Sequence, residues 1–126
     1  MSIFENVTRA ELKDCFIDKN DNLVFIVRED QIGKAIGKQG TNVKRLKQLL
    51  NRKIKIVEFN SNLIQFIKNL VYPLTLKEIR DDDGIVILVG NDTKTRGLLI
   101  GREAQNLRSL ETTVRRYFTV EEIKVE

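Results

Sequence analysis

The chain has 126 residues and a net charge of +4, with 41% hydrophobic and 32% charged residues. This length fits one ordinary domain or two very small ones, with enough apolar residues for a core. The single cysteine excludes an intrachain disulfide, and the absence of histidine removes the commonest general base and the commonest metal ligand.

The sequence shows no pattern for secretion or membrane insertion. The first residues lack a basic segment followed by an apolar one, and no run of about 18 apolar residues occurs. We therefore expect a cytoplasmic protein that makes no membrane contact. Cys15 is followed by Phe16 and Ile17, which predicts a core position for its side chain.

Positive charge is concentrated in one part of the chain. Residues 28–55 hold nine basic side chains against Glu29 and Asp30, so this window carries +7 and the remainder carries −3. Charge of one sign at this density indicates a polyanionic partner, and a solvated basic helix face is the alternative.

The first sixty residues show the patterns of six elements. In chain order we predict a helix from Glu5 or Thr8 to Lys13, strands at 14–18 and 22–28, helices at 30–36 and 41–51, and a strand at 54–56. The polar residues 18–21 have turn composition and join the two strands. Val43, Leu46 and Leu50 are spaced by three and four, which predicts the buried stripe of the longer helix.

The remaining residues repeat this order. We predict a helix at 62–72 with Ser61 as N-cap, strands at 74–80 and 85–89, a helix at 93–100, a longer helix with the stripe Ala104 to Phe118, and a strand at 123–125. Asp83-Gly84 closes the second hairpin, and Pro73 ends the first helix. The sequence therefore predicts an α+β fold of two tandem domains, 1–60 and 61–126, each with the order α-β-β-α-α-β. The short connection Phe59-Asn60 predicts that they pack as one rigid unit.

The repeat is most visible where two helices meet in each half. Residues 36–44 align with residues 100–108 at an offset of 64, with Ile, Gly and Asn coinciding. In the first copy, Gly37 and Gly40 are three apart, so another molecule can approach the backbone without obstruction from side chains. The amides of the following helix favour an anion at this junction, and Lys38 adds a cation. The pattern indicates a phosphate contact.

These residues resemble a known family. Ile-Gly-Lys-Gln-Gly-Thr-Asn-Val at 36–43, joining two helices behind a hairpin, is similar to the K-homology (KH) RNA-binding domain in its type II arrangement. Two such units, together with the stretches 66–69, 116–118 and 123–125, resemble the archaeal NusA-like transcription factors. The resemblance implies that single-stranded RNA lies across the loop, with about four nucleotides per domain. RNA polymerase is a further candidate partner, and we expect a monomer without cofactor or metal.

The resemblance also implies roles for individual residues. The first loop would be formed by Gly37, Lys38, Gln39 and Gly40, with Lys38 at a phosphate. An apolar groove for the bases would be lined by Ile32, Ile36, Val43 and Ile54 or Ile56. Electrostatic support would come from Lys34, Lys44 and Arg45. The second unit would contribute Gly101, Arg102, Glu103 and Ala104, with Arg108 at the position that matches Lys44.

The second loop departs from the family pattern. Ala104 replaces the second glycine and disfavours a left-handed backbone, unless position 104 is already helical. Glu103 places a negative charge where a phosphate should pass. We expect the second unit to bind RNA more weakly or to serve partly as a packing platform.

Other functions are weighed against RNA binding. A nucleotide-binding P-loop fails on spacing, because Ile32 stands where its first glycine is needed and Gln39 where Ser or Thr is needed. The carboxylates of residues 81–83 are more typical of a solvated turn than of a metal site. No catalytic set is present, so we expect no enzyme. The alternative to RNA binding is an adaptor that docks on RNA polymerase or a ribosomal particle with little RNA contact.

Overall fold

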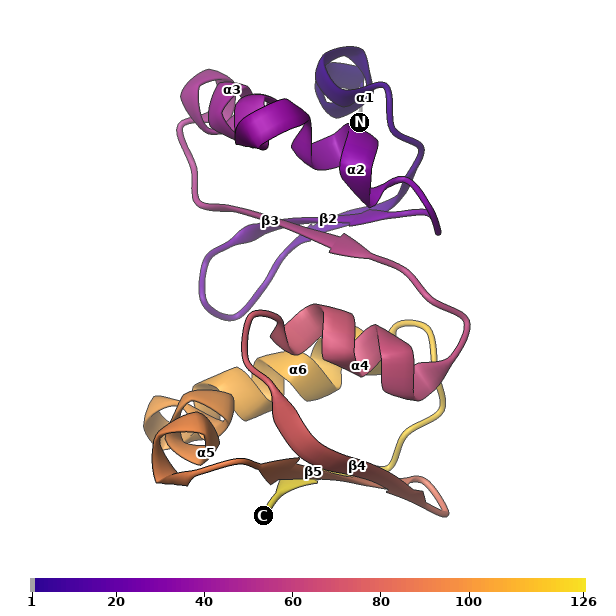
Figure 1. Ribbon diagram of the computed structural model, residues 1–126, viewed down its shortest axis with the longest axis vertical. Coiled ribbons are helices and arrows are strands. Elements are labelled where there is room, and N and C mark those ends of the chain that lie inside the picture. Colours follow the sequence, from indigo (N-terminus) through magenta and orange to yellow (C-terminus); the bar gives the residue numbers. More distant parts are fainter. Residues whose placement is uncertain (1) are drawn as a thin grey trace. The chain divides into compact units, whose positions relative to one another are not determined.

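A computed structural model describes residues 2–126 of the chain (Figure 1). Contacts within the chain divide it into two compact units, Met1–Asn60 (unit 1) and Ser61–Glu126 (unit 2). Each unit contains helices and one three-stranded sheet, which confirms the predicted α+β class.

Unit 1 has the predicted order of elements. These are α1 (Ser2–Thr8), β1 (Leu12–Ile17), β2 (Leu23–Val27), α2 (Ile32–Ile36), the 3-10 turn η1 (Lys38–Gly40), α3 (Thr41–Leu50) and β3 (Ile54–Glu58). In the sheet, β2 lies between β1 and β3 and pairs antiparallel with β1 and parallel with β3. The three helices lie on one face of this sheet (Figure 1). Consequently the junction between α2 and α3 lies on the helical side of the unit.

The prediction of a first helix reaching Lys13 is wrong. The helix ends at Thr8, and Leu12 and Lys13 begin β1. The Thr8 hydroxyl donates to the carbonyl of Phe4 at 2.9 Å and accepts from the Ala10 amide at 3.1 Å. Arg9 then takes a left-handed backbone with φ 63°, which ends the helix. A side chain that bonds the backbone here overrides the helical spacing of the sequence.

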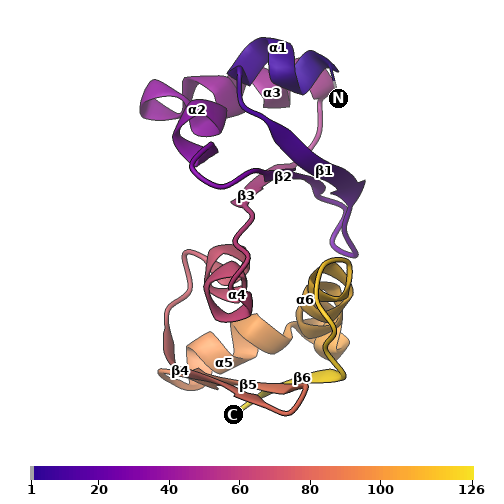
Figure 2. The ribbon, with the colours of Figure 1, turned by 90° about the vertical axis from the view of Figure 1, so that its right-hand side faces the viewer.

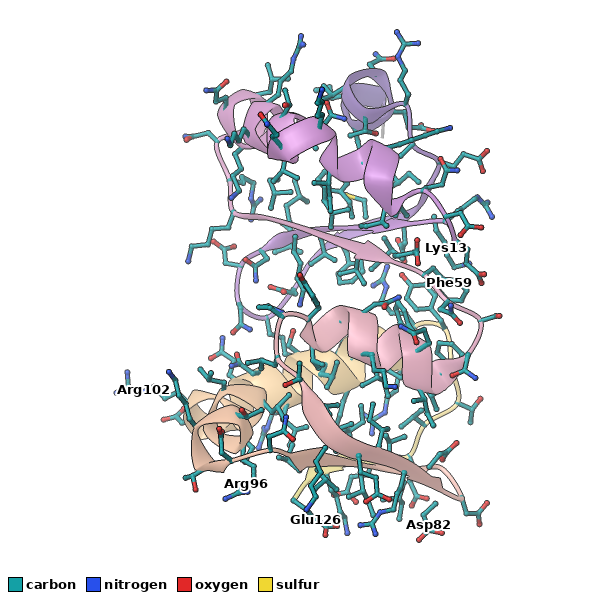
Figure 3. All side chains as sticks on the ribbon, viewed as in Figure 1. Lys13, Phe59, Asp82, Arg96, Arg102 and Glu126 are labelled. Atoms are coloured by element: carbon teal, nitrogen blue, oxygen red, sulfur yellow. The ribbon has the colours of Figure 1, made fainter. Side chains whose placement is uncertain are left out.

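The core of unit 1 joins the helices to the sheet. Its fully buried members are Phe4, Ala10, Phe25, Val27, Ala35 and Leu46. The rings of Phe4 and Phe25 stack with centroids 4.4 Å apart. Cys15 packs against this cluster but is only half-buried, and burial raises the pKa of its thiol. Lys13 Nζ lies 4.4 Å from the centroid of the Phe59 ring (Figure 3).

Unit 2 repeats the order of unit 1. Its elements are α4 (Leu63–Val71), β4 (Leu76–Asp82), β5 (Ile85–Gly90), α5 (Thr93–Ile100), the 3-10 turn η2 (Arg102–Ala104), α6 (Gln105–Arg115) and β6 (Glu122–Val125). The strand β5 lies between an antiparallel β4 and a parallel β6, and the helices cover one face of the sheet (Figure 2). The predicted hairpin turn is confirmed, since Asp83 and Gly84 lie between β4 and β5 with φ of 51° and 91°.

Two predicted helix ends in unit 2 are wrong. The N-cap of α4 is Asn62 rather than Ser61, because the Asn62 side chain accepts the Gln65 amide at 3.0 Å. The apolar stripe from Ala104 to Phe118 extends beyond α6, which covers only Gln105–Arg115. Phe118 lies in the turn after the helix and packs against the buried Phe66, with ring centroids 5.8 Å apart. The apolar stripe thus marks residues that pack against the core, and this packing continues in the turn after the helix has ended.

Candidate nucleic-acid interface

The loop of unit 1 has a backbone that requires its first glycine. Gly37 adopts φ 77° and ψ 170°, a combination that is essentially restricted to glycine. Gln39 and Gly40 follow in left-handed conformations, with φ of 56° and 73°. The Gly40 amide donates to the carbonyl of Gly37 at 3.1 Å, which closes the turn. The chain therefore reverses tightly between α2 and α3.

Asn42 holds this turn in place. Its Nδ2 donates to the carbonyl of Lys34 at 2.8 Å and so bridges α3 to α2 across the loop. A Cβ added to Gly37 would lie 2.8 Å from Asn42 Cγ, closer than any side chain can pack. The matching asparagines were visible in the sequence repeat, but their coincidence alone did not indicate a role. The structure assigns Asn42 as the residue that sets the path of the loop.

The loop of unit 2 has almost the same backbone. Gly101 adopts φ 75° and ψ 176°, Glu103 has φ 54°, and Ala104 has φ 61° and ψ 22°. Asn106 Nδ2 donates to the carbonyl of Leu98 at 2.8 Å, as Asn42 does to Lys34. The alternative that position 104 is helical is therefore wrong. The bridge from Asn106 imposes the left-handed conformation on alanine, although it favours glycine.

The side chains of the two loops differ in charge. Lys38 and Gln39 are exposed, and so are the flanking Lys34, Lys44 and Arg45. Within residues 2–126, the salt bridges at up to 4.0 Å include none of these four cations. In unit 2, Arg102 and Arg108 are exposed, and Arg102 extends away from the ribbon (Figure 3), but the exposed Glu103 lies beside Arg102 in the turn. Unit 1 thus offers the more uniformly positive loop.

The predicted apolar groove residues do not all lie near the loop. Ile36 precedes Gly37 and is 38% exposed, while Ile32 and Val43 are half-buried on the two helices that flank the turn. Ile54 and Ile56 pack against the core of unit 1. Ile54 begins β3 directly after the C-terminal end of α3, whereas the loop precedes the N-terminal end of that helix. The structure therefore brings Ile32, Ile36 and Val43 to the loop but not Ile54.

The helices that lead into the loops begin differently. Asp92 caps α5, and its carboxylate accepts the Thr95 amide at 2.7 Å. This hydrogen bond lowers the pKa of the Asp92 carboxyl, with smaller contributions from the nearby Arg96 and Lys94. The corresponding Gln31 at the start of α2 makes no such cap. At the start of the helix before its loop, unit 2 therefore has a side-chain cap that Gln31 does not provide in unit 1.

The part of the chain from residue 2 to 126 contains neither a membrane-spanning helix nor a cluster of metal ligands. Its helices are too short or too polar to cross a bilayer. No three acidic, cysteine or histidine side chains gather there closely enough to hold a metal ion. Of the carboxylates at 81–83, that of Asp81 accepts the Gly84 amide at 3.3 Å and so supports the hairpin turn.

Known proteins share this sequence and fold. The family model of the KH domain matches residues 1–71, which include the loop of unit 1. The probable transcription termination protein NusA of Methanococcus vannielii is 34% identical over 128 residues, covering 99% of this chain and 73% of that protein. Its counterpart from Thermoplasma acidophilum is 29% identical, covering 100% of this chain and 89% of that protein. The crystal structure of APE1850 has a TM-score of 0.76 at 28% identity, covering 99% and 94% of the two chains. The chain therefore belongs to the KH-domain family and, within it, to the NusA-like proteins.

Proposed function

We propose that this chain is a NusA-like transcription factor that binds single-stranded RNA, with the loop at 37–40 as its principal contact. The observation that carries the proposal is the turn at Gly37, which Asn42 bridges and which is surrounded by exposed cations that form no salt bridge within residues 2–126. The relatives are named as probable transcription termination proteins, which supports nascent transcripts as the RNA.

The chemistry of this contact follows from the turn. Gly37 has no Cβ, and a Cβ added to Gly40 would meet open space, so a sugar-phosphate backbone can lie against the main chain. Lys38 is placed to pair with a phosphate, and Lys34, Lys44 and Arg45 raise the local concentration of the polyanion. The partly exposed Ile36 offers apolar surface to a base. The contact needs binding alone, so we propose no enzymatic activity.

We propose that unit 2 is a second KH domain with weaker affinity for RNA. Its loop has the backbone of the first, but Glu103 opposes a phosphate. Its α5 and α6 otherwise repeat the arrangement of α2 and α3. The domains would then correspond to 1–60 and 61–126.

The wider role is inferred from the same relatives. We propose that the protein acts as a monomer in the cytoplasm, where transcripts are made, and that RNA polymerase is a second partner. The competing function is an adaptor that contacts polymerase or a ribosomal particle without RNA, for which the acidic second loop is the supporting feature.

Charge reversal at the loop tests RNA binding directly. Lys38→Asp is expected to reduce the affinity for a fluorescein-labelled single-stranded RNA by about tenfold or more, since it replaces a phosphate contact with a repulsion. Lys124→Asp is the matched control, because it makes the same change of charge on β6, next to the buried Ile123 and thus on the sheet face away from the helices. Fluorescence anisotropy measures the affinity, and circular dichroism checks folding. Equal affinities of both variants and the parent would reject the loop assignment and favour the adaptor.

A further inference from the structure

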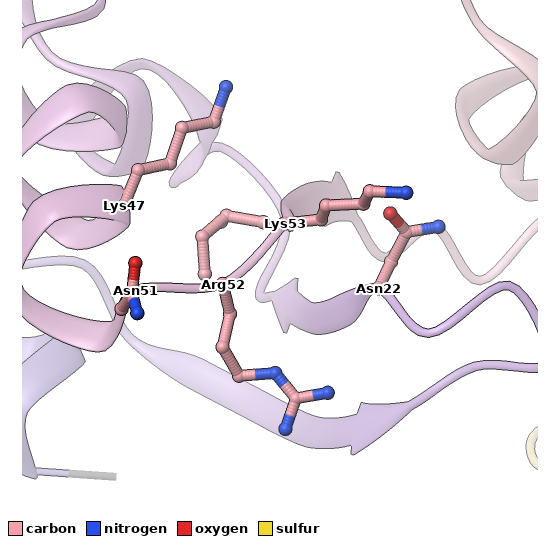
Figure 4. A pocket seen from close by; sticks show the side chains of 6 residues that line it. Asn22, Lys47, Asn51, Arg52 and Lys53 are labelled. Atoms are coloured by element: carbon pink, nitrogen blue, oxygen red, sulfur yellow. The ribbon is translucent and has the colours of Figure 1, made fainter.

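A second basic site lies at the far end of the helix that follows the first loop. A pocket of about 420 Å³ is lined by Asn22, Lys47, Asn51, Arg52, Lys53 and Ile54 (Figure 4). Asn51 ends α3 in a left-handed conformation, with its amide bonded to the carbonyl of Lys47, and turns the chain toward β3. The Lys53 carbonyl then accepts the Leu23 amide at 2.8 Å. These contacts place the end of a helix, a turn and two strands around one hollow.

Among the residues that the structure describes, the two lysines of this pocket have no carboxylate partner. Arg52 Nη2 pairs with Asp21 at 3.0 Å, and its guanidinium points away from Lys47 and Lys53 (Figure 4). The second acid of that turn, Asp18, accepts the Asn22 amide nitrogen Nδ2 at 3.1 Å. Within residues 2–126, the salt bridges include neither Lys47 nor Lys53. Two lysines without a salt bridge therefore line the pocket.

In unit 2, the position that corresponds to Lys47 holds a residue that stabilises the fold. Glu111 stands 64 residues after Lys47, and its carboxylate accepts the Ile123 amide at 2.9 Å and lies 3.9 Å from Arg115. That carboxylate ties α6 to β6. Lys47 makes no corresponding bond to β3 that the structure records. The lysine is thus available for a ligand at a position where the other unit has a structural acid.

We propose that this pocket binds a phosphate of the same RNA strand that crosses the loop at 37–40. Lys44 and Lys47 are three residues apart on α3, so they lie on one face and connect the loop to the pocket. The eleven residue-to-residue steps from Gly40 to Asn51 span about 16 Å along the helix axis. A KH loop accommodates about four nucleotides, so a strand must be longer to reach both sites. This continuity of cations favours RNA over an acidic protein segment.

The test compares the affinities of the protein for a short and a long RNA. The proposal rests on the proposed function. The full chain is titrated with labelled single-stranded RNAs of mixed sequence, about 5 and about 12 nucleotides long. Lys47→Gln with Lys53→Gln is expected to lower the affinity for the longer RNA about tenfold and to leave the shorter one unchanged. The dependence of log affinity on log salt should become shallower by about 0.7 for the longer RNA, since the pocket holds one phosphate and each single-strand phosphate contact contributes about 0.7.

The control removes two exposed lysines from unit 2. Lys68→Gln with Lys124→Gln is expected to change neither affinity. Lys47 also lies in the last turn of α3, where a cation favours the helix dipole, so urea unfolding of both double variants is measured alongside. An affinity loss that is equal for both RNAs, or absent for the longer one, overturns the proposal.

A polyglutamate peptide and the parent protein distinguish the remaining outcomes. If polyglutamate binds the parent as tightly as the longer RNA and is weakened by the same two substitutions, the pocket takes an acidic protein segment and the proposal is rejected. If the parent binds neither RNA, the proposed function itself has failed and the pocket proposal falls with it. Binding of the short RNA that depends on Lys38, without any effect at Lys47 and Lys53, rejects the pocket alone.

Discussion

Asn42 occupies the space that a side chain at Gly37 would need, since a Cβ on Gly37 would lie 2.8 Å from Asn42 Cγ. The same asparagine donates to the carbonyl of Lys34 at 2.8 Å, so one side chain both positions the loop and excludes substitution within it. The equivalent pair in unit 2 is Asn106 and Gly101. This relationship explains why the first glycine is retained in both loops while the second is not.

Alanine substitutions at the two glycines of the first loop should differ in cost. Gly37→Ala combines a backbone conformation restricted to glycine with a clash against Asn42, so we expect a loss of about 2–4 kcal/mol in the free energy of unfolding. A Cβ at position 40 would meet open space, so Gly40→Ala is disfavoured only by the left-handed backbone. We expect it to lower the free energy of unfolding by about 1 kcal/mol. Urea unfolding followed by circular dichroism measures both. A larger loss at Gly40 than at Gly37 would contradict the role given to Asn42.

The reverse change in the second loop should stabilise the protein. Ala104 has φ 61° and ψ 22°, close to the 73° and 19° of Gly40. Ala104→Gly relieves the left-handed strain, and we expect a gain of about 0.5–1 kcal/mol in the free energy of unfolding. The control is Ala35→Gly in the buried part of α2, which should destabilise the protein because it removes a packed methyl group. A loss at position 104 would show that its backbone is not left-handed.

The loop of unit 2 should bind RNA more tightly when the negative charge of Glu103 is removed. Glu103→Gln with Ala104→Gly restores the pattern of the first loop, so we expect RNA affinity to rise about three- to tenfold by removal of one repulsive charge. The measurement is made in a Lys38→Asp background, so that the first loop contributes little. Unchanged anisotropy titrations would indicate that unit 2 makes no RNA contact through this loop.

The cap of α5 makes the stability of unit 2 depend on pH. The hydrogen bond from the Thr95 amide lowers the pKa of Asp92 below its ordinary value of 3.8, so the ionised carboxylate stabilises the folded state. This contribution is fully present above the unfolded pKa and is lost as the pH falls through the lower folded pKa. Asp92→Ala should therefore reduce the urea midpoint at pH 7, and the difference from the parent should vanish in strong acid. Asp92→Asn still accepts the Thr95 amide, so its remaining stabilisation should not vary with pH.

Local patterns predicted most of the fold, while contacts between elements decided the rest. The Asp83-Gly84 hairpin and the helix at 41–50 follow from turn residues and apolar spacing, which the sequence displays directly. The end of α1 depends on the Thr8 hydroxyl, which accepts the Ala10 amide, and such a bond leaves no periodic signal. The left-handed Ala104 depends on the bridge from Asn106 to Leu98, which no propensity of alanine indicates.

For the candidate site, too, local sequence patterns predicted one part, and contacts between distant elements decided the rest. The loop residues and their flanking lysines were predicted because glycine spacing and charge are visible in the sequence, and the structure shows them exposed. The pocket at the other end of α3 combines Asn22 with residues about thirty positions later, so only the parallel pairing of β2 with β3 brings them together. The family resemblance implied Ile54 or Ile56 for the groove, but that pairing places Ile54 in the lining of the pocket.

The bridge from Asn42 has a consequence for how such loops can change over time. The residues that fix the path of each turn are a glycine and an asparagine, whereas the side chains at 38–39 and 102–103 point to solvent and support no other part of the fold. Natural selection can therefore alter the ligand preference of one turn by exchanging exposed residues, with little penalty to folding. Two turns of nearly the same path can therefore carry different exposed residues within one chain, as Lys38-Gln39 and Arg102-Glu103 do.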